Sequence, residues 1–397
     1  MYSLRELYKV GNGPSSSHTI GPLKATKEFL KRYPNVDYVR VVLYGSLALT
    51  GRGHLTDYII EKTMHTVPCD IDFNINDEMK HPNTMEFRGY NSKRQLIGHM
   101  IVYSVGGGAI KIEGEDERAH EKIYPLSTFD SISKYCKDNK LSLVDYVDKY
   151  EDEEFNSYIE TIFNTMIKSV ENGIKSVGVL PGNLLIKRKA RYIYFQNSSI
   201  DNDVERKRIL AYAYAAAEEN ASGGEIVTAP TCGASGVVPA ILCHVLETCH
   251  YDHKQIIDAL KVAGLIGNIV KTNGSISGAE AGCQAEVGTA CAMAAAFLAY
   301  LWIGTTESVE RAAEIALEHH LGLTCDPISG YVQIPCIERN AVAALRAVDA
   351  VKLTSYLNNS DSKISFDMVV KTMLDTGKAL HSDYRETSEG GLAKNYQ

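Results

Sequence analysis

The stretch NGSISGAEAGCQAEVGTA, residues 273–290, places Cys283 between a loop of small residues and the start of an apolar segment. Glycine, alanine and serine add little bulk, so this backbone can pass close to a bound group. Two more cysteines follow, Cys325 in LTCDP and Cys336 in IPCIERN. Soft thiolates at three loop positions can hold an iron–sulfur cluster or a zinc ion. We predict that these cysteines are metal ligands and that the remaining chain shapes a pocket over them.

The number of ligands indicates the chemistry that such a centre would support. The three cysteines do not have the C-x-x-C spacing of a zinc knuckle, so spacing alone does not select the metal. Three thiolates on a four-iron cube leave one iron open, and an open iron can act as a Lewis acid on a substrate hydroxyl and carboxylate. A cluster that only transfers electrons normally has four protein ligands.

The apolar segment after Cys283, residues 287–303, reads VGTACAMAAAFLAYLWI and has almost no polar side chain. Its length is near the lower limit of a membrane span. Glu280 and Glu286 flank it, however, and alanine and glycine are frequent within it. We therefore predict a helix buried at the centre of a helical domain, and no membrane partner.

Composition and charge exclude several classes of protein. A chain of 397 residues with 45% hydrophobic and 23% charged residues has the profile of a globular protein with two or three domains. A formal charge of −8 argues against nucleic acid and anionic membranes as partners. The start MYSLRELYKVGNG lacks the basic residues and apolar run of a signal peptide, so we expect a cytoplasmic protein. In that compartment we do not expect its nine cysteines to form a disulfide framework.

The pattern along the chain predicts an α+β N-terminal domain followed by a larger all-α C-terminal domain. Residues 1–120 are expected to form the small domain, because short β-branched runs at 38–43, 84–90 and 95–105 read as strands. A helix is expected at 21–31, and a second one within 48–65 after the Gly51–Gly53 turn. Residues 121–152 are expected to be a linker or helical connection. Residues 153–397 carry mostly helical signals, and helices are predicted at 134–177, 207–220, 255–270, 309–321, 339–358 and 365–380.

Near the start of the chain, the motif GPSSSHT contains Ser15, Ser16, Ser17, His18 and Thr19. Hydroxyls and free backbone N–H groups can hold a carboxylate or phosphate, particularly where a helix begins. The alternative is a plain N-cap cluster on a surface turn, because serine and threonine favour helix starts.

Other loops offer polar groups of the same kind. His54 lies in the glycine-flanked turn TGRGHLTD, which can present an imidazole as a general base, although a lone loop histidine is more often solvated. His81 in KHPNTMEF is a weaker candidate. EIVTAPTCGASGVVPA, residues 225–240, has too many small polar groups for a simple connector, and Thr231 within it is a candidate binding residue. Lys271 lacks the strand and glycine context of a Schiff-base lysine, which argues against pyridoxal phosphate.

Taken together, GPSSSHT, LYGSLALTGRGH, SVGGGAI, SISGAEAGCQAEVG and TCDPISGYVQIPCIERNA resemble, in order, the iron–sulfur-dependent bacterial L-serine dehydratases in their single-chain form. The resemblance covers essentially the whole chain. It implies a small β domain joined to a helical α domain with a [4Fe–4S] cluster that has one open iron. It places the cluster ligands at Cys283, Cys325 and Cys336.

The resemblance also implies roles for the other candidates. His54 falls on the proposed base, and His18 and the three serines fall on the β-domain motif. We expect His18 to be catalytic together with His54. His81 falls on another family histidine. We expect the turn of Ser15, Ser16, Ser17 and Thr19, with Asn273, Gly274, Ser275 and Thr231, to bind the substrate L-serine. The expected reaction eliminates water and gives pyruvate and ammonia.

Three alternatives remain open at this point. The first is a related iron–sulfur lyase such as an L-cysteine desulfidase. The second is a non-catalytic regulator that binds an amino acid or a metal, with zinc at the cysteines. The third, a helical protein with buried thiols, leaves the serine and histidine loops without a role. We expect a homodimer, because isologous pairs are the commonest assembly.

Overall fold

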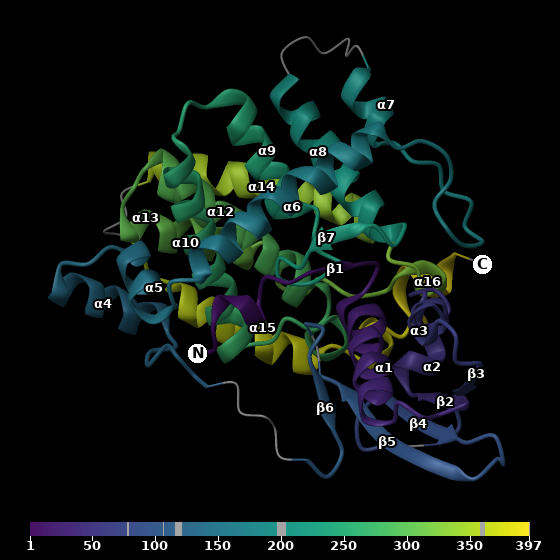
Figure 1. The fold of residues 1–397 in the computed structure, drawn as a ribbon. Helices are drawn as coiled ribbons and strands as arrows, with labels where there is room; N and C mark the ends of the chain where they lie inside the picture. The colour runs from purple at the N-terminus through teal and green to yellow at the C-terminus, as the bar shows by residue number, and fades with distance from the viewer. Residues whose placement is uncertain (78, 106, 116–120, 197–203, 358–361, 397) are drawn as a thin grey trace.

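The computed structural model describes residues 1–77, 79–105, 107–115, 121–196, 204–357 and 362–396. Two parts are visible in Figure 1: a small sheet region with its helices, and a larger helical body. This arrangement confirms the predicted fold class, an α+β region followed by a mostly helical one.

The small part is built on a five-stranded sheet. The strands lie in the order β3 (Cys69–Asn74), β2 (Tyr38–Tyr44), β4 (Thr84–Tyr90), β5 (Leu96–Ser104) and β6 (Ile110–Ile112). Only β2 and β3 are parallel; the other neighbours are antiparallel. In β2, buried Val39, Val41 and Leu43 alternate with outward-facing positions such as exposed Arg40, as expected of a sheet with one covered face.

Two helices cover this sheet, α1 (Gly21–Arg32) and α3 (Thr56–Met64) (Figure 1). Phe29 of α1 and Ile60 of α3 pack with the inward residues of the strands in one apolar cluster. The short helix α2 (Ser46–Thr50) follows β2, and a break at residues 51–55 separates it from α3. A helix was predicted within 48–65, after the Gly51–Gly53 turn, and α3 begins after that turn.

The helical body is organised around α12 (Thr289–Trp302), which packs against α9, α10, α13 and α14. Every residue from Thr289 to Ala299 is buried. The apolar run Gln284–Trp302 is long enough to cross a membrane by composition, but 78% of its apolar window is buried inside the protein. The predicted core helix is therefore confirmed. Around it lie α4 (Phe129–Asn139), α5 (Leu143–Tyr150), α6 (Phe155–Lys175), α7 (Ala190–Phe195), α8 (Val204–Ala221), α9 (Val237–Thr248), α10 (His253–Asn273), α11 (Gly278–Ala281), α13 (Thr306–Glu318), α14 (Cys336–Tyr356), α15 (Phe366–Ala379) and α16 (Gly391–Asn395).

The first residues of the chain belong to the helical body and not to the five-stranded sheet. Leu4, Leu7 and Tyr8 lie in the same apolar cluster as α12. The strand β1 (Val10–Asn12) then pairs antiparallel with β7 (Glu225–Val227). The C-terminal part was predicted to be all helical, but it contains the strand β7. The partner strand is more than two hundred positions away in the sequence, so no local pattern could show this pairing.

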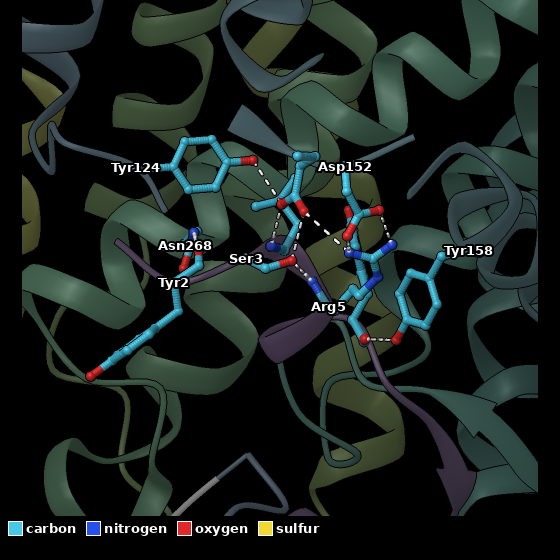
Figure 2. Close-up of polar contacts among 10 residues, drawn as sticks. Tyr2, Ser3, Arg5, Tyr124, Asp152, Tyr158 and Asn268 are labelled. Atoms are coloured by element: carbon cyan, nitrogen blue, oxygen red, sulfur yellow. Dashed lines mark hydrogen bonds and ion pairs between the residues drawn. The ribbon is translucent and has the colours of Figure 1, made fainter. Parts of the chain in front are cut away.

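A buried carboxylate anchors this N-terminal segment. Glu151, which follows α5, accepts hydrogen bonds from the Ser3 hydroxyl at 2.7 Å, from the Leu4 amide at 2.7 Å and from the Tyr124 hydroxyl at 2.8 Å. Figure 2 shows Ser3, Arg5 and Tyr124 converging on this point, with Asp152 facing Arg5. The anchor fixes the stretch that leads into the serine turn described next.

Candidate functional site

A pocket lies where the small part meets the helical body. The small part contributes residues from two turns, and the helical body contributes residues from five separate segments. The lining residues are Pro14, Ser15, His54, Gly233, Cys283, Glu286, Cys325, Pro327, Val332, Cys336 and Glu386. The three cysteines predicted as ligands therefore share one pocket with His54, the predicted base.

Cys283 immediately precedes the short π-helical turn η3 (Gln284–Gly288), which continues into α12. Its neighbour Gly282 has φ +75°. A Cβ at Gly282 would lie 2.8 Å from the Leu323 carbonyl oxygen, so only glycine fits this turn. The small residues of the stretch 273–290 thus let the cysteine loop pass close to neighbouring backbone, as the sequence indicated.

Cys325 and Cys336 come from two further segments of the helical body. The Cys325 amide donates to the Tyr384 carbonyl, and its carbonyl accepts from the Glu386 amide, each at 2.8 Å. Cys336 is the first residue of α14, where the helix N-terminus favours a negative charge. Arg339, one turn later, pairs with Asp326 at 3.0 Å. Its guanidinium lies close enough to Cys283 to favour the thiolate there.

Cys283 and Cys325 are buried, and Cys336 is partly buried. Burial raises the pKa of Cys283 to about 11 and raises those of Cys325 and Cys336 well above the ordinary value. The negative charge on each sulfur also disfavours ionisation of the others. A bound metal centre would reverse this preference, because metals bind thiolates and release the protons. Among the residues that the structure describes, no three His, Cys, Asp or Glu side chains converge as ligands of one metal ion.

His54 is fully buried and is held from one side. Its Nδ1 lies 3.1 Å from the Thr50 hydroxyl, and that hydroxyl donates its own hydrogen to the Ser46 carbonyl at 2.9 Å. The Thr50 oxygen can therefore only accept from His54, so Nδ1 carries the ring proton. Nε2 is then a bare acceptor, and it has no hydrogen-bond partner. Burial, and next the neighbouring His18, lower the pKa of His54 well below its ordinary value.

His18 lies behind His54 and is also fully buried. The two ring centroids are 4.4 Å apart. The Ser17 hydroxyl lies 2.9 Å from His18 Nδ1 and the Ser46 hydroxyl 3.0 Å from Nε2, so both ring nitrogens are engaged. Burial lowers the pKa of His18 to about 4. The ring is thus a neutral support for His54 and is not among the pocket-lining residues.

The serine turn has one member in the pocket. Ser15 lines it and also caps the short π-helical turn η2 (Ser16–Ile20), because its hydroxyl accepts from the His18 amide at 3.1 Å. The Ser16 hydroxyl accepts from the Cys232 amide at 2.9 Å, and the Thr19 hydroxyl donates to the His54 carbonyl at 2.8 Å. These contacts join the turn to the helical body and to the His54 turn.

Two carboxylates in the pocket were not predicted as site residues. Glu286 accepts a hydrogen bond from the Thr231 hydroxyl at 2.7 Å, so Thr231 is connected to the pocket through it. Glu386 has φ +61°, and its amide is bonded to Cys325. Burial raises the pKa of Glu386 to about 8, and the nearby Glu286 adds to the effect. Glu286 stands three positions after Cys283, and this closeness in sequence could have indicated that Glu286 belongs to the site.

Besides Ser16, Ser17, His18, Thr19 and Thr231, four further predicted site residues do not line the pocket. The Asn273 amide donates to the Ile269 and Ser127 carbonyls and ends α10. Gly274 packs against Met373 and Val370. The Ser275 hydroxyl donates to Glu280 at 2.6 Å. His81 accepts from the Asn83 amide at 3.0 Å and lies near Glu280.

The fold and the pocket define a protein with an α+β part and a helical body that together enclose thiols, an unpartnered imidazole nitrogen and carboxylates. The family model for the serine dehydratase beta chain matches residues 3–65, and that for the serine dehydratase alpha chain matches residues 75–393. The chain belongs to the serine dehydratase family.

Named relatives cover the chain almost from end to end. L-serine dehydratase of Haemophilus influenzae is 38% identical over 99% of both chains. L-serine dehydratase 2 of Escherichia coli is 40% identical over 99% of this chain and 98% of its own. L-serine dehydratase of Helicobacter pylori is 39% identical with the same coverage.

Proposed function

We propose that this protein is an L-serine ammonia-lyase that eliminates water from L-serine and yields pyruvate and ammonia. The observation that carries the proposal is the convergence of Cys283, Cys325 and Cys336 with the unpartnered Nε2 of His54 in one pocket. The names of the relatives, which match over the full length, support the choice of L-serine.

The donor set fits a [4Fe–4S] cluster better than a single metal ion. Sulfurs around one tetrahedral zinc lie within about 4 Å of each other, because each Zn–S bond is about 2.3 Å. Among the described side chains, no three His, Cys, Asp or Glu are placed to hold one metal ion, and cysteine thiolates are the usual ligands of an iron–sulfur cluster. The thiols are buried or partly buried, and Arg339 offsets the negative charge at Cys283. When bound, a cluster with three thiolate ligands supplies one open iron as a Lewis acid toward the substrate hydroxyl.

His54 takes the Cα proton of the substrate. Its Nε2 is a bare acceptor that lines the pocket, and its Nδ1 proton is fixed by Thr50. The low pKa keeps the ring neutral before the reaction, so Nε2 holds a free lone pair. His18, neutral behind it, holds the turn in place. No lysine lines the pocket within the described residues, so the proton transfer is assigned without pyridoxal phosphate.

Ser15 is the member of the serine turn that can reach the substrate carboxylate. Ser16, Ser17 and Thr19 hold its position through their own hydrogen bonds. Roles for His81, Asn273, Gly274 and Ser275 in substrate binding stay predictions. So do the division into residues 1–120, 121–152 and 153–397, the cytoplasmic location and the homodimer.

Anaerobic purification tests the proposal directly. We expect about four iron and four sulfide per chain, and pyruvate from L-serine that stops on exposure to air. Release of sulfide from L-cysteine without pyruvate from L-serine would favour the desulfidase alternative. Zinc at one per chain without turnover would favour the regulator. Cys283→Ser should lose iron and activity together.

The base is tested by His54→Ala. General-base catalysis contributes about 10²–10⁴-fold, so kcat should fall by that factor while the iron content stays constant. The matched control is His319→Ala at the exposed end of α13, which should keep wild-type kcat. Near-normal turnover of His54→Ala would remove His54 from the mechanism.

A further inference from the structure

The pocket is lined by acidic groups that have no cation beside them in the lining. Its lining, within the described residues, contains three sulfurs and two carboxylates but no lysine or arginine. Arg339, which interacts with Cys283, does not line the pocket and is held by Asp326 and by the Thr324 carbonyl. A ligand that is only an anion would meet no positive side chain here.

Both carboxylates are held in place but have acceptor capacity left. One oxygen of Glu286 accepts from Thr231, and the other flanks Gly278 beside the Cys325 sulfur. Glu386 is fixed by its backbone bond to Cys325. Neither carboxylate forms an ion pair with any cation in the described part of the chain. An ionised carboxylate can accept about four hydrogen bonds, and leaving it buried without a cation is costly.

A second observation points to a ligand in the same place. His54 Nε2 is a completely buried polar atom without a partner, and His54 lines this pocket from the small part. A polar group left unsatisfied in this way indicates a partner that arrives with the ligand. The ligand must therefore satisfy an acceptor nitrogen and two carboxylates and still leave access to the sulfurs.

We propose that Glu286 and Glu386 bind the α-ammonium group of the substrate, and that they make the site selective for α-amino acids over acids of the same shape without the amine. The inference rests on the proposed function and adds a substrate group to it. The ammonium group faces the wall formed by the helical body, and the Cα–H faces His54. A site built to accept hydrogen bonds from an ammonium rejects an analogue that lacks it, because buried acceptors then stay unpaired.

The test compares L-serine with 3-hydroxypropanoate, which has the same hydroxyl and carboxylate but no amine. Both are measured on anaerobically purified holoenzyme of wild type, Glu286→Gln and Glu386→Gln, by steady-state kinetics and by calorimetric binding. The control is Glu310→Gln, which removes a partly buried carboxylate of α13 that accepts from the Phe366 amide, away from the pocket. Iron content is determined for each protein.

We expect each pocket variant to raise KM and Kd for L-serine by about tenfold or more, as for the loss of a hydrogen bond to a charged group. Binding of 3-hydroxypropanoate should change by less than twofold, and Glu310→Gln should match the wild type for both compounds. Equal losses for both compounds would overturn the inference, and so would a fall in kcat at constant KM. A wild type that binds L-serine in preference to 3-hydroxypropanoate but makes no pyruvate would overturn the proposed function alone and still support the ammonium site.

Discussion

Gly53 precedes the proposed base and touches the helical body, so Gly53→Ala tests whether the fit between the two parts sets the rate. A Cβ at Gly53 would lie 2.8 Å from the Gly330 carbonyl carbon and 2.9 Å from the carbonyl oxygens of Gly330 and Ser329. Ordinary contacts between such atoms are about 3.5 Å. The turn must therefore retreat by roughly 0.6 Å, because the opposing atoms are backbone and cannot rotate away.

The expected strain lowers activity without unfolding the protein. Overpacking of this size costs about 1–3 kcal/mol, which a protein of ordinary stability tolerates. A displacement of 1 Å can cost about 10²-fold in rate, so a shift of roughly 0.6 Å predicts a loss of about tenfold in kcat/KM. Anaerobic pyruvate formation measures this, together with thermal unfolding and iron content. Arg52→Ala, one position earlier and exposed, is the control. Turnover of Gly53→Ala within twofold of wild type would refute the reasoning.

Further predictions concern the two buried networks. Burial lowers the folded pKa of His18 to about 4, and its unfolded pKa is about 6.5. The unfolded state therefore binds more protons between these values, and about 3 kcal/mol of stability is lost as the pH falls from 6.5 to 4. The raised pKa of Glu386 changes stability with pH in the opposite direction. The contribution of His18 is therefore isolated by comparing the urea unfolding free energies of wild type and His18→Gln at pH 7 and pH 5. Equal pH dependence of the two proteins would contradict the prediction. Glu151→Ala should lower the unfolding free energy by about 3 kcal/mol, because it strands the Leu4 amide and the Tyr124 hydroxyl. Asp152→Ala removes an exposed ion pair with Arg5 and should lower the unfolding free energy by less than about 1 kcal/mol. Similar losses for Glu151→Ala and Asp152→Ala would show that the burial of Glu151 does not matter.

The sequence predicted the elements that local pattern determines. The strand at 84–90 and the helix at 365–380 agree with β4 and α15 to within a residue. The predicted helix at 339–358 is α14, although its last position lies outside the described residues. The region 134–177 proved to be three helices, because Ser142 and the segment before Phe155 begin new ones.

What the sequence could not show depends on contacts between distant segments. The pairing of β1 with β7 needs both strands at once. The role of Glu386 in the pocket depends on its backbone bond to Cys325, some sixty positions away. Conversely, Asn273 lies next to the cysteine loop in sequence, but its amide is used to end a helix.

The turn around Cys325 also secures the last described part of the chain. Besides the bonds of Cys325 to Tyr384 and Glu386, Asp326 accepts from the Leu392 amide at 2.8 Å and the Pro327 carbonyl accepts from the Ser388 hydroxyl at 2.7 Å. The segment around Cys325, a proposed metal ligand, is thus held directly to residues 384–392. A change that breaks these hydrogen bonds should also free the last described residues. The rate at which a protease cleaves there should therefore report whether the turn around Cys325 is intact.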